Sequence, residues 1–511
     1  MTIQKYARVM TCLVSGGILV MGLFLFLGTT AQTARADPGD MFARPGASGT
    51  CAQSSPCSLQ AALSTANDGD AIYLAGGTYT SSGGAVMTIT HNIDIYGGWN
   101  GSATGVPVLN PNLYPSTIDG QGARRGVFVN SGATVTLQGL IITNGWDDYQ
   151  GAGVYAQDAS LTLRQTTVYS NAIDIYDTPD TYAYGSGLML DGGTLVVEES
   201  TFRSNSAWAR KSSYGGGIAA MGAVTVTVVD TLFEDNDAWH ASGLYFLGEA
   251  GGTHWPLTLL NNNFVNNGLA NSGTRAYGGY AGAIEVSRAD AQIDGNIFKH
   301  NNAGNDYGGI AIYSSRLSMD GNWILENQSQ RTVGLYLYAV SPFNLTNNVI
   351  AQNQTFWARQ NAALRIGNSQ GWLAHNTLAQ NSSVYGMLLE GSTVELANTI
   401  LVSHTVGISV TAGSTATLEA TLWGSGDWAN DLDWGGEGVI ETTSNLWEEP
   451  GFVDPGSRNY HINSASKAID AGVNADVMVD IDGQARPAGS GYDIGADEFV
   501  IQRLFLPLVR K

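Results

Sequence analysis

One short phrase returns along most of the chain and restricts the fold more than any other feature. It reads apolar-x-apolar, then polar, then apolar-apolar-x-x-Asn, as in LTLRQTTVYSN and LVVEESTFRSN. The longest interval between copies is 34 residues (171 to 205) and the shortest is 22 (404 to 426). Such a period indicates a stack of structural repeats. The copies end at Asn171, Asn205, Asn236, Asn267, Asn301, Asn327, Asn353 and Asn381, and in degenerate form at His404 and Gly426.

A second phrase, small-Gly-apolar-x-apolar, lies between the copies, for example from Gly308 and from Val333. Each unit therefore holds two or three short alternating runs separated by turn residues, which is a strand pattern. A single unit cannot bury its apolar side, whereas parallel strands stacked about 4.8 Å apart would bury a continuous interior. The recurring Asn suits a left-handed turn position, and its side chain can hydrogen-bond from coil to coil.

These observations predict an all-β, single-stranded right-handed parallel β-helix with a short N-terminal cap and a C-terminal capping module. Leucine-rich repeats are the first alternative, but they need a Leu-rich helical return, and here the return carries Gly and another alternating strand. Propellers are the second alternative, and they need a repeat of about 40 residues or more.

Three stretches resemble known families. The GG-apolar phrases at Gly216 and Gly308, together with the Phe-x-x-Asn phrases from Phe202 to Asn301, resemble the repeats of polymorphic outer-membrane proteins over about residues 150–310. The segment CSLQAALSTANDGDAIYLAGGTYT resembles the start of the pectin-lyase-like superfamily. Residues 446–498 resemble the choice-of-anchor Q segment that follows β-helices in secreted bacterial proteins. The resemblance implies a β-helix protein at or outside the cell surface.

The chain divides into five predicted parts. Residues 1–36 have the pattern of a secretory signal that ends in Ala34-Arg35-Ala36, with an uncleaved anchor as the alternative. Residues 37–86 form the N-terminal cap and first strands, 87–445 the β-helix, 446–498 the C-terminal segment, and 499–511 an apolar tail with a basic end. A short helix is expected at 58–66. In an exported chain, Cys51 and Cys57 predict one disulfide.

Composition limits the partners. The chain has 44 acidic and 23 basic residues, a formal charge of −21, so we expect no binding to nucleic acid or anionic membranes. The hydrophobic fraction of 43% excludes disorder caused by too few apolar residues. A secreted or cell-surface monomer without a membrane span in its mature form is expected.

The repeat places one file of residues on the outside of the first strand of each coil. Glu285 and Arg365 lie three coils apart in it, about 14 Å at strand spacing. No acid–base cluster is therefore expected on this face. The file reads Tyr155, Met189, Ala219, Tyr245, Glu285, Ala311, Tyr336, Arg365, Leu388 and Ser409.

The resemblance to polysaccharide-cleaving β-helices requires a search for catalytic groups. Asp294 and Asp320 are predicted on adjacent coils, where two carboxylates could hold a cation or serve a glycosidase. Each begins an Asp-Gly-Asn phrase, so a turn role is favoured. Arg210, Lys211 and His240 are the further weak candidates for acid–base work.

Aromatic residues gather in the loops after the Asn positions. They could stack on sugar rings, although packing the loops onto the coil is the favoured role. The candidate ligand-binding residues are Trp208, Tyr214, Trp239, Tyr280, Tyr307 and Trp357.

Asp480 and Asp482 resemble part of a calcium loop, but the twelve-residue pattern is incomplete, and an ion pair from Asp482 to Arg486 is favoured. No cofactor is expected, with Ca²⁺ as the alternative. The leading hypothesis is a polysaccharide- or surface-binding protein without catalysis. A polysaccharide lyase or glycoside hydrolase, and a purely structural scaffold, are the alternatives.

Overall fold

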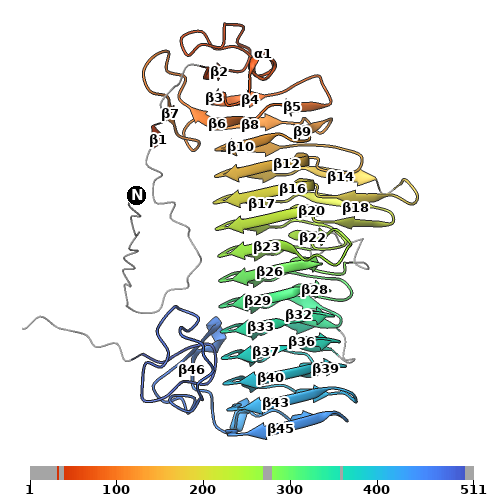
Figure 1. Ribbon diagram of the computed structural model, residues 1–511, viewed down its shortest axis with the longest axis vertical. Helices are drawn as coiled ribbons and strands as arrows, with labels where there is room; N and C mark the ends of the chain where they lie inside the picture. Colours follow the sequence, from red (N-terminus) through yellow and green to blue (C-terminus); the bar gives the residue numbers. More distant parts are fainter. Residues whose placement is uncertain (1–31, 34–38, 176, 269–278, 357–360, 501–511) are drawn as a thin grey trace, which may run out of the picture.

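The computed structural model describes residues 32–33, 39–175, 177–268, 279–356 and 361–500. The strands stack into one long column, with a small cap at the N-terminal end and the C-terminal segment lying against its side (Figure 1). Neighbouring coils pair in parallel throughout the column, as in β12 (Val154–Arg164) with β16 (Leu188–Glu198). The predicted β-helix is confirmed.

Each coil contributes strands to three faces. One face is a 12-stranded parallel sheet. Its strands are β4 (Gly77–Tyr79), β8 (Ser116–Asp119), β11 (Leu140–Thr143), β13 (Thr167–Tyr169), β17 (Thr201–Arg203), β21 (Leu232–Glu234), β24 (Asn263–Val265), β27 (Ile297–Lys299), β30 (Trp323–Leu325), β34 (Val349–Ala351), β38 (Thr377–Ala379) and β41 (Ile400–Val402).

The other two faces join into a single sheet because β12, β16 and β20 (Ile218–Val229) run across both. The face that begins after the Gly phrase contains β5 (Ala85–Ile89), β9 (Arg125–Val129), β22 (Leu244–Gly248), β25 (Ile284–Ser287), β28 (Ile310–Tyr313), β32 (Thr332–Tyr338), β36 (Ala362–Gly367), β39 (Tyr385–Glu390), β42 (Val406–Val410) and β44 (Leu432–Gly435). The last face contains β2 (Met41–Ala43), β3 (Ala71–Ala75), β6 (Ile93–Trp99), β10 (Thr134–Gln138), β23 (Trp255–Leu260), β26 (Ala289–Asp294), β29 (Arg316–Asp320), β33 (Phe343–Thr346), β37 (Gln370–Ala374), β40 (Thr393–Ala397), β43 (Thr415–Glu419) and β45 (Val439–Thr443).

Short strands lie outside these faces. Two parallel pairs extend loops between coils, β14 (Ala172–Ile175) with β18 (Ser206–Ala209) and β15 (Tyr182–Tyr184) with β19 (Ser212–Tyr214). The remaining elements are β1 (Gln32–Thr33), which pairs with β7 (Val108–Leu109), β31 (Gln328–Ser329), which pairs with β35 (Gln354–Thr355), β46 (Phe452–Asp454), which pairs with β47 (Asn459–Ile462), and the 3₁₀ turns η1 (Gly426–Trp428) and η2 (Pro455–Ser457).

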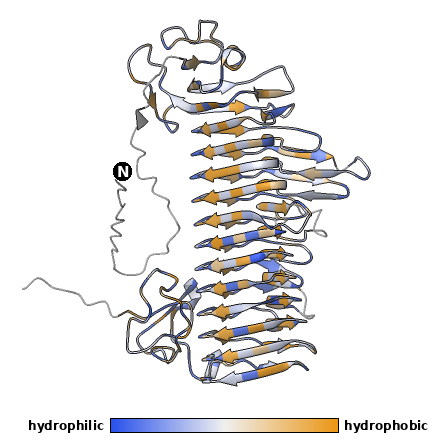
Figure 2. Ribbon diagram, in the orientation of Figure 1, coloured by the Kyte–Doolittle hydropathy of each residue, from blue (hydrophilic) through white to orange (hydrophobic). Residues whose placement is uncertain are grey.

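The interior of the column is apolar and layered. Side chains alternate between the inside and the outside along each strand, as Figure 2 shows in the colour changes along the arrows. The Phe of each Phe-x-x-Asn phrase points inward, and four of these rings stack. Their centroids are 5.3 Å apart for Phe202 and Phe233, 4.5 Å for Phe233 and Phe264, and 4.9 Å for Phe264 and Phe298. Identical residues at one register position therefore build one continuous core.

The recurring asparagines form a buried vertical ladder. Each Nδ2 donates to Oδ1 of the Asn on the next coil, over 2.9 Å from Asn171 to Asn205 and 2.9 Å from Asn353 to Asn381. At the end, Nδ2 of Asn381 donates to Nε2 of His404 over 3.2 Å. The next member is Asn430 rather than the predicted Gly426, because Oδ1 of Asn430 accepts from the His404 amide.

The left-handed residue of each turn is not the Asn itself. It is the residue before it, such as Ser170 with φ 53° and Ser204 with φ 51°. The expectation that the Asn adopts this conformation is wrong, because the Asn side chain must point inward to reach the ladder.

A second ladder of asparagines lies five residues upstream of the first, and the sequence analysis did not predict it. Asn262 donates to Asn296 over 3.0 Å and Asn296 to Asn322 over 3.1 Å, and the ladder continues through Asn348 to Asn376. The Asn in each Asp-Gly-Asn phrase belongs to it. The spacing of five residues was the signal in the sequence that could have predicted it.

The N-terminal end is closed as expected. The helix α1 (Leu59–Thr65) begins after Ser58, whose Oγ accepts from the Ala61 amide. Leu59 and Ala62 are buried against the first coil, and the Cys51–Cys57 disulfide closes the adjoining loop. The helix therefore shields the apolar end of the stack.

The C-terminal segment lies along the side of the lower coils, where β46 is labelled in Figure 1. Its apolar residues Phe452, Tyr460 and Ile494 share one buried cluster with residues of the 12-stranded sheet such as Ile400 and Val402. The expected capping of the last coil is not observed: Leu432 and Val439 on that coil are each 53% exposed.

No helix within the described part of the chain is long and apolar enough to span a membrane. The predicted signal at 1–36 lies outside the described residues, apart from the pair Gln32–Thr33, and the tail from residue 501 also lies outside them.

Candidate functional site

Aromatic side chains gather at the corner where each coil leaves the 12-stranded sheet and returns to the face that begins after the Gly phrase. We call it the loop corner; it lies on the right in Figure 1, where β14 and β18 project. Trp146, Tyr149 and Tyr280 are its exposed large side chains, 36%, 54% and 38% accessible. Its described segments are 144–153, 171–175, 177–187, 205–217, 236–243, 279–283 and 301–309.

Four aromatic rings on successive coils stack into a column on this corner. The ring centroids are 5.2 Å apart for Tyr184 and Tyr214, 4.6 Å for Tyr214 and His240, and 4.6 Å for His240 and Tyr280. Because the rings face one another at interplanar angles of 11° to 19°, they present mainly their edges to solvent. Burial raises the pKa of the Tyr214 hydroxyl, which therefore stays protonated and able to donate a hydrogen bond.

The predicted outward file lies beneath this column. The strand register joins Tyr155 to Met189, Tyr245 to Glu285 and Tyr336 to Arg365, and it agrees with the prediction at every step. The file is not open to solvent, however, because Tyr155 and Tyr245 are only 7% exposed under the loops.

One pair on this corner escaped the sequence analysis. Nδ1 of His240 lies 2.9 Å from Oε2 of Glu285, with side-chain exposures of 19% and 14%. Glu285 belongs to the outward file, whereas His240 belongs to a loop, so listing one file at a time could not bring them together. The carboxylate holds a histidine whose faces are covered by Tyr214 and Tyr280.

A second aromatic group continues the corner further along the column. The rings of Tyr307 and Tyr336 stack at 4.3 Å and 5°. The Arg365 guanidinium lies 5.7 Å from the Tyr336 ring centroid and donates to both oxygens of Glu390, over 2.7 Å and 3.0 Å. The charges of Arg365 and Glu390 are therefore paired with one another. Burial raises the pKa of Tyr307, whose hydroxyl therefore also stays protonated.

A surface depression of about 530 Å³ lies beside Trp146. Polar residues line the same depression, including Asp119, Asn144 and Ser170. An exposed aromatic face with polar neighbours is an arrangement that can stack on a sugar ring and hydrogen-bond its hydroxyls. The sequence analysis did not select Trp146; its position two residues after Asn144, at the start of the repeat count, was the available signal.

The other predicted ligand-binding residues differ in accessibility. Trp208 in β18 is only 6% exposed and therefore offers little ring surface. Trp239 is half-buried. Trp357 lies outside the described residues. Arg210 is exposed, and the ammonium of Lys211 lies 4.8 Å from the Tyr182 ring centroid, a cation–π contact at the rim of the loops.

Asp294 and Asp320 lie on adjacent coils, as predicted. Each carboxylate accepts hydrogen bonds from the following coil. Asp294 accepts from the Asp320 amide over 3.1 Å, and Asp320 accepts from Thr346 Oγ1 over 2.5 Å and from Asn347 Nδ2 over 2.9 Å. Burial raises the pKa of Asp294. These bonds favour the turn interpretation over a glycosidase pair.

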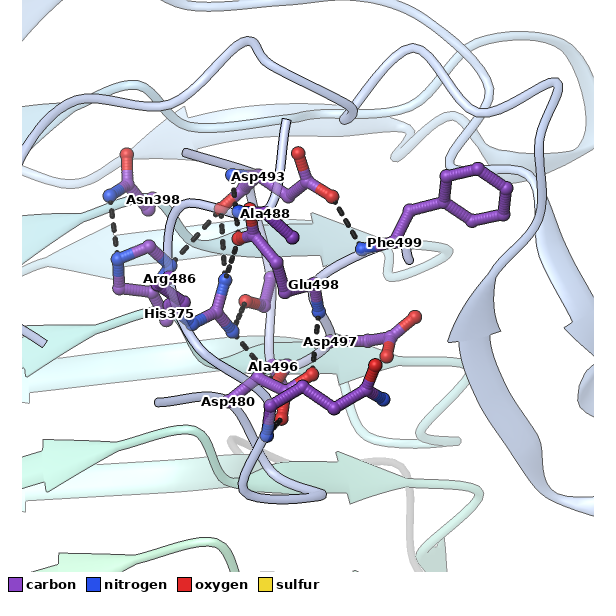
Figure 3. A network of polar contacts seen from close by, with 12 residues as sticks. His375, Asn398, Asp480, Arg486, Ala488, Asp493, Ala496, Asp497, Glu498 and Phe499 are labelled. Carbon is purple, nitrogen blue, oxygen red and sulfur yellow. Dashed lines mark hydrogen bonds and ion pairs between the residues drawn. The ribbon is translucent and has the colours of Figure 1, made fainter. Parts of the chain in front are cut away.

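The predicted ion pair from Asp482 to Arg486 is wrong. Arg486 pairs with Glu498 over 2.9 Å, and both side chains are fully buried (Figure 3). Asp480, also drawn in Figure 3, uses one carboxylate oxygen for the amides of Asp482 and Gln484 and the other for that of Glu498. Its carboxylate therefore closes a turn and joins it to the end of the segment.

Two overlapping stretches of the chain, residues 112–282 and 239–422, match the family model for the right handed beta helix region. The chain belongs to this family. No curated protein matches the chain significantly.

Solved structures with similarity to the chain include the pectate lyase Pel9A, at 15% identity and a TM-score of 0.35 over 91% of this chain and 97% of that one. The periplasmic alginate epimerase AlgG matches at 14% identity and a TM-score of 0.42, over 62% and 76%. Tailspike protein 3 of bacteriophage CBA120 matches at 13% identity and a TM-score of 0.42, over 76% and 57%.

Proposed function

We propose that the protein works outside the cell and binds polysaccharide along the loop corner. The observation that carries this proposal is the row of exposed aromatic side chains at one corner of a rigid column, with Trp146 beside a depression lined by polar groups. The Trp146 ring can stack on the apolar face of a sugar ring, whereas the stacked tyrosines offer their ring edges and hydroxyls, which can contact and hydrogen-bond the sugar hydroxyls. A rigid coil keeps these groups in place before the ligand arrives, which lowers the entropic cost of binding.

The charge of the corner favours a neutral polysaccharide. Its described segments contain seven aspartates and two basic residues, a formal balance of 2 − 7 = −5, and the ion pairs of Asp147 with Arg125 and of Asp306 with Arg331 from adjoining segments reduce it to −5 + 2 = −3. An anionic polysaccharide would be repelled by this surface, and the whole chain adds to the repulsion with its charge of −21. The charged residues counted are Asp147, Asp148, Asp174, Asp177, Asp180, Arg210, Lys211, Asp237 and Asp306.

The extracellular part of the proposal is supported by the disulfide. Cys51 and Cys57 are bonded in the N-terminal cap, and such bonds persist mainly in oxidising compartments.

Affinity electrophoresis of the purified protein through gels containing neutral or acidic polysaccharides tests the proposal. We expect retardation by a neutral glycan, and roughly threefold to tenfold weaker binding for Trp146→Ala and for Tyr280→Ala, as expected for a lost aromatic contact. Trp447→Ala is the matched control, because Trp447 is 51% exposed but lies near the other end of the column. Retardation by no glycan would leave the scaffold hypothesis standing instead.

A second candidate function, glycan cleavage, rests on the pair His240 and Glu285. With Nδ1–H donating to the carboxylate, Nε2 carries the lone pair that would remove the proton from the carbon next to the carboxylate of a uronic acid residue, so this candidate requires an acidic polysaccharide. The C–H electrons would form a double bond as the glycosidic oxygen departs and takes a proton from solvent. Incubation with the same glycans tests this candidate. Unsaturated ends that form with the wild type and not with His240→Gln would support it, and bound glycan without product would refute it.

A further inference from the structure

Three side chains from separate parts of the C-terminal segment converge at one point. They are His461 in β47, Asp482 in the following loop and Asp497 near the end of the segment, and one ligand atom of each lies within 4.8 Å of the others. These positions are separated by 21 residues (461 to 482) and 15 residues (482 to 497). The cluster lies far from the loop corner along the chain and is independent of the proposed glycan binding.

The tautomer of His461 can be assigned from its neighbours. Nδ1 of His461 lies 2.6 Å from Oδ1 of Asn459, and the same oxygen accepts from the His461 amide over 3.1 Å. An atom that accepts from a backbone N–H is the amide oxygen, so Nδ1 carries the proton and donates it. The neutral ring then has its lone pair on Nε2, which is the form in which histidine binds a metal while the other nitrogen is held by a hydrogen bond.

Nε2 of His461 faces the Asp482 carboxylate. It lies 2.9 Å from Oδ2 of Asp482, a contact that is an ion pair when the imidazole is protonated, and the approach is not aligned for a linear hydrogen bond. With the neutral ring, the two lone pairs at this distance repel one another unless a cation lies close to both. A metal ion that also reaches Asp497 would take the place of the proton, because histidine binds metals in its neutral form.

Asp497 supplies a third oxygen from a buried position. It is 6% exposed, and Oδ2 accepts from the Ile462 amide over 2.7 Å. The hydrogen bond from the Ile462 amide reaches only Oδ2, so Oδ1 is available as a ligand atom. Asp480 is not part of the cluster, and both of its oxygens accept backbone amides.

We propose that His461 Nε2, Asp482 and Asp497 bind one divalent transition metal ion of the zinc class. One imidazole nitrogen and two carboxylate oxygens suit Zn²⁺, Mn²⁺ or Co²⁺, whereas Ca²⁺ prefers oxygen ligands alone. Two ligand atoms about 2.0–2.2 Å from one tetrahedral ion lie roughly 3.3–3.5 Å apart. The distance of 2.9 Å from His461 Nε2 to Asp482 Oδ2 is shorter than this value, and the upper limit of 4.8 Å for the cluster is longer. Small side-chain movements would therefore complete the site.

The ion can enter from solvent, and its role is to join the segment together. The Asp482 side chain is 45% exposed, which leaves a path and room for a water ligand. Bound metal would add a direct link between β47, the Asp482 loop and the final turn to the existing contacts, such as the hydrogen bonds from Ile462 to Asp497 and from Glu498 to Asp480. Binding to the folded state alone stabilises that state.

Calorimetric titration of chelator-treated full-length protein with Zn²⁺, Co²⁺, Mn²⁺, Ca²⁺ and Mg²⁺ tests the proposal. We expect one equivalent of Zn²⁺ or Co²⁺ to bind, a higher unfolding temperature with Zn²⁺, and a visible Co²⁺ spectrum typical of mixed nitrogen and oxygen ligands. His461→Gln and Asp482→Asn should each weaken Zn²⁺ binding at least tenfold. Asp476→Asn is the matched control, since Asp476 is exposed in the same segment outside the cluster.

Asp482→Asn is the variant expected to fold normally, because the Asp482 side chain is half-exposed and asparagine has nearly the same shape. Circular dichroism of each variant without metal verifies folding. Failure of all three transition metals to bind, preference for Ca²⁺ or Mg²⁺, or unchanged affinity in the folded variants would overturn the proposal.

Discussion

The coil body and the C-terminal segment satisfy their buried polar groups in different ways. In the body, each Asn bonds to the same residue type one coil away, so the pattern repeats. In the C-terminal segment, Arg486 bonds to Glu498, to three carbonyl oxygens and to Asn347, which is 139 residues away in the sequence. A repeated contact can be inferred from the period of the sequence, whereas a unique one requires the folded chain.

The largest effect is expected from breaking the unique contact. Arg486→Met leaves the Glu498 carboxylate buried and unpaired, so we expect the C-terminal segment to lose about 3–5 kcal/mol of stability. Urea unfolding and limited proteolysis after residue 446 measure the loss.

Arg164→Met in the coil body is the matched control. Arg164 pairs with Glu198 over 2.7 Å, but the side chains are 50% and 38% exposed, so the expected loss is below about 1 kcal/mol. Equal losses for the two variants would contradict the distinction between the regions.

A break in the repeated contact should have the next largest effect. Asn267→Ala removes the acceptor for the amide and Nδ2 of Asn236 and the donor to Phe233 O and Asn301 Oδ1. Because these groups are buried, we expect the free energy of unfolding to fall by about 3 kcal/mol. Chemical denaturation measures the fall, and a change below about 1 kcal/mol would show that the ladder does not stabilise the coil.

The histidine in the ladder should make the coil sensitive to acid. Burial lowers the pKa of His404 to about 4, from about 6.5 in the unfolded chain. The unfolded state then binds the proton more readily, so the stability that this group contributes is complete above pH 6.5 and is lost as the pH falls toward 4. Between pH 8 and pH 5 the loss is about 2 kcal/mol.

His404→Asn restores the amide of the ladder and removes this titration. Comparison of the unfolding free energies of both proteins at pH 8 and pH 5 isolates the group, because all other titrations are shared. If the difference in unfolding free energy between the two proteins is the same at pH 8 and at pH 5, the lowered pKa of His404 and its burial are contradicted.

The smallest effect on stability is expected at the loop corner. Tyr280 is 38% exposed, so Tyr280→Ala should change the free energy of unfolding by less than about 1 kcal/mol while it weakens glycan binding. Thermal unfolding measures the first quantity. A larger loss would assign the ring column to folding rather than to ligand recognition.

Much of the fold could be predicted because the same backbone contacts recur in every coil. The outward file from Tyr155 to Ser409 agrees with the register at each step.

The candidate site was predicted less well. Tyr214, His240 and Tyr280 belong to it, but Trp208 is buried and Trp146 was missed. Loop conformation depends on insertions that differ from coil to coil, so the period carries no information about it.

The sequence by itself determined the β-helix, its register and the vertical row of asparagines, because one period imposes the same hydrogen bonds and the same inward side on every coil. Only the tertiary structure decided that loops cover the outward file, that the C-terminal segment lies on the flank, and that His240 meets Glu285 while His461 meets Asp482. These contacts join residues from non-repeating segments, where distance along the chain does not determine distance in space.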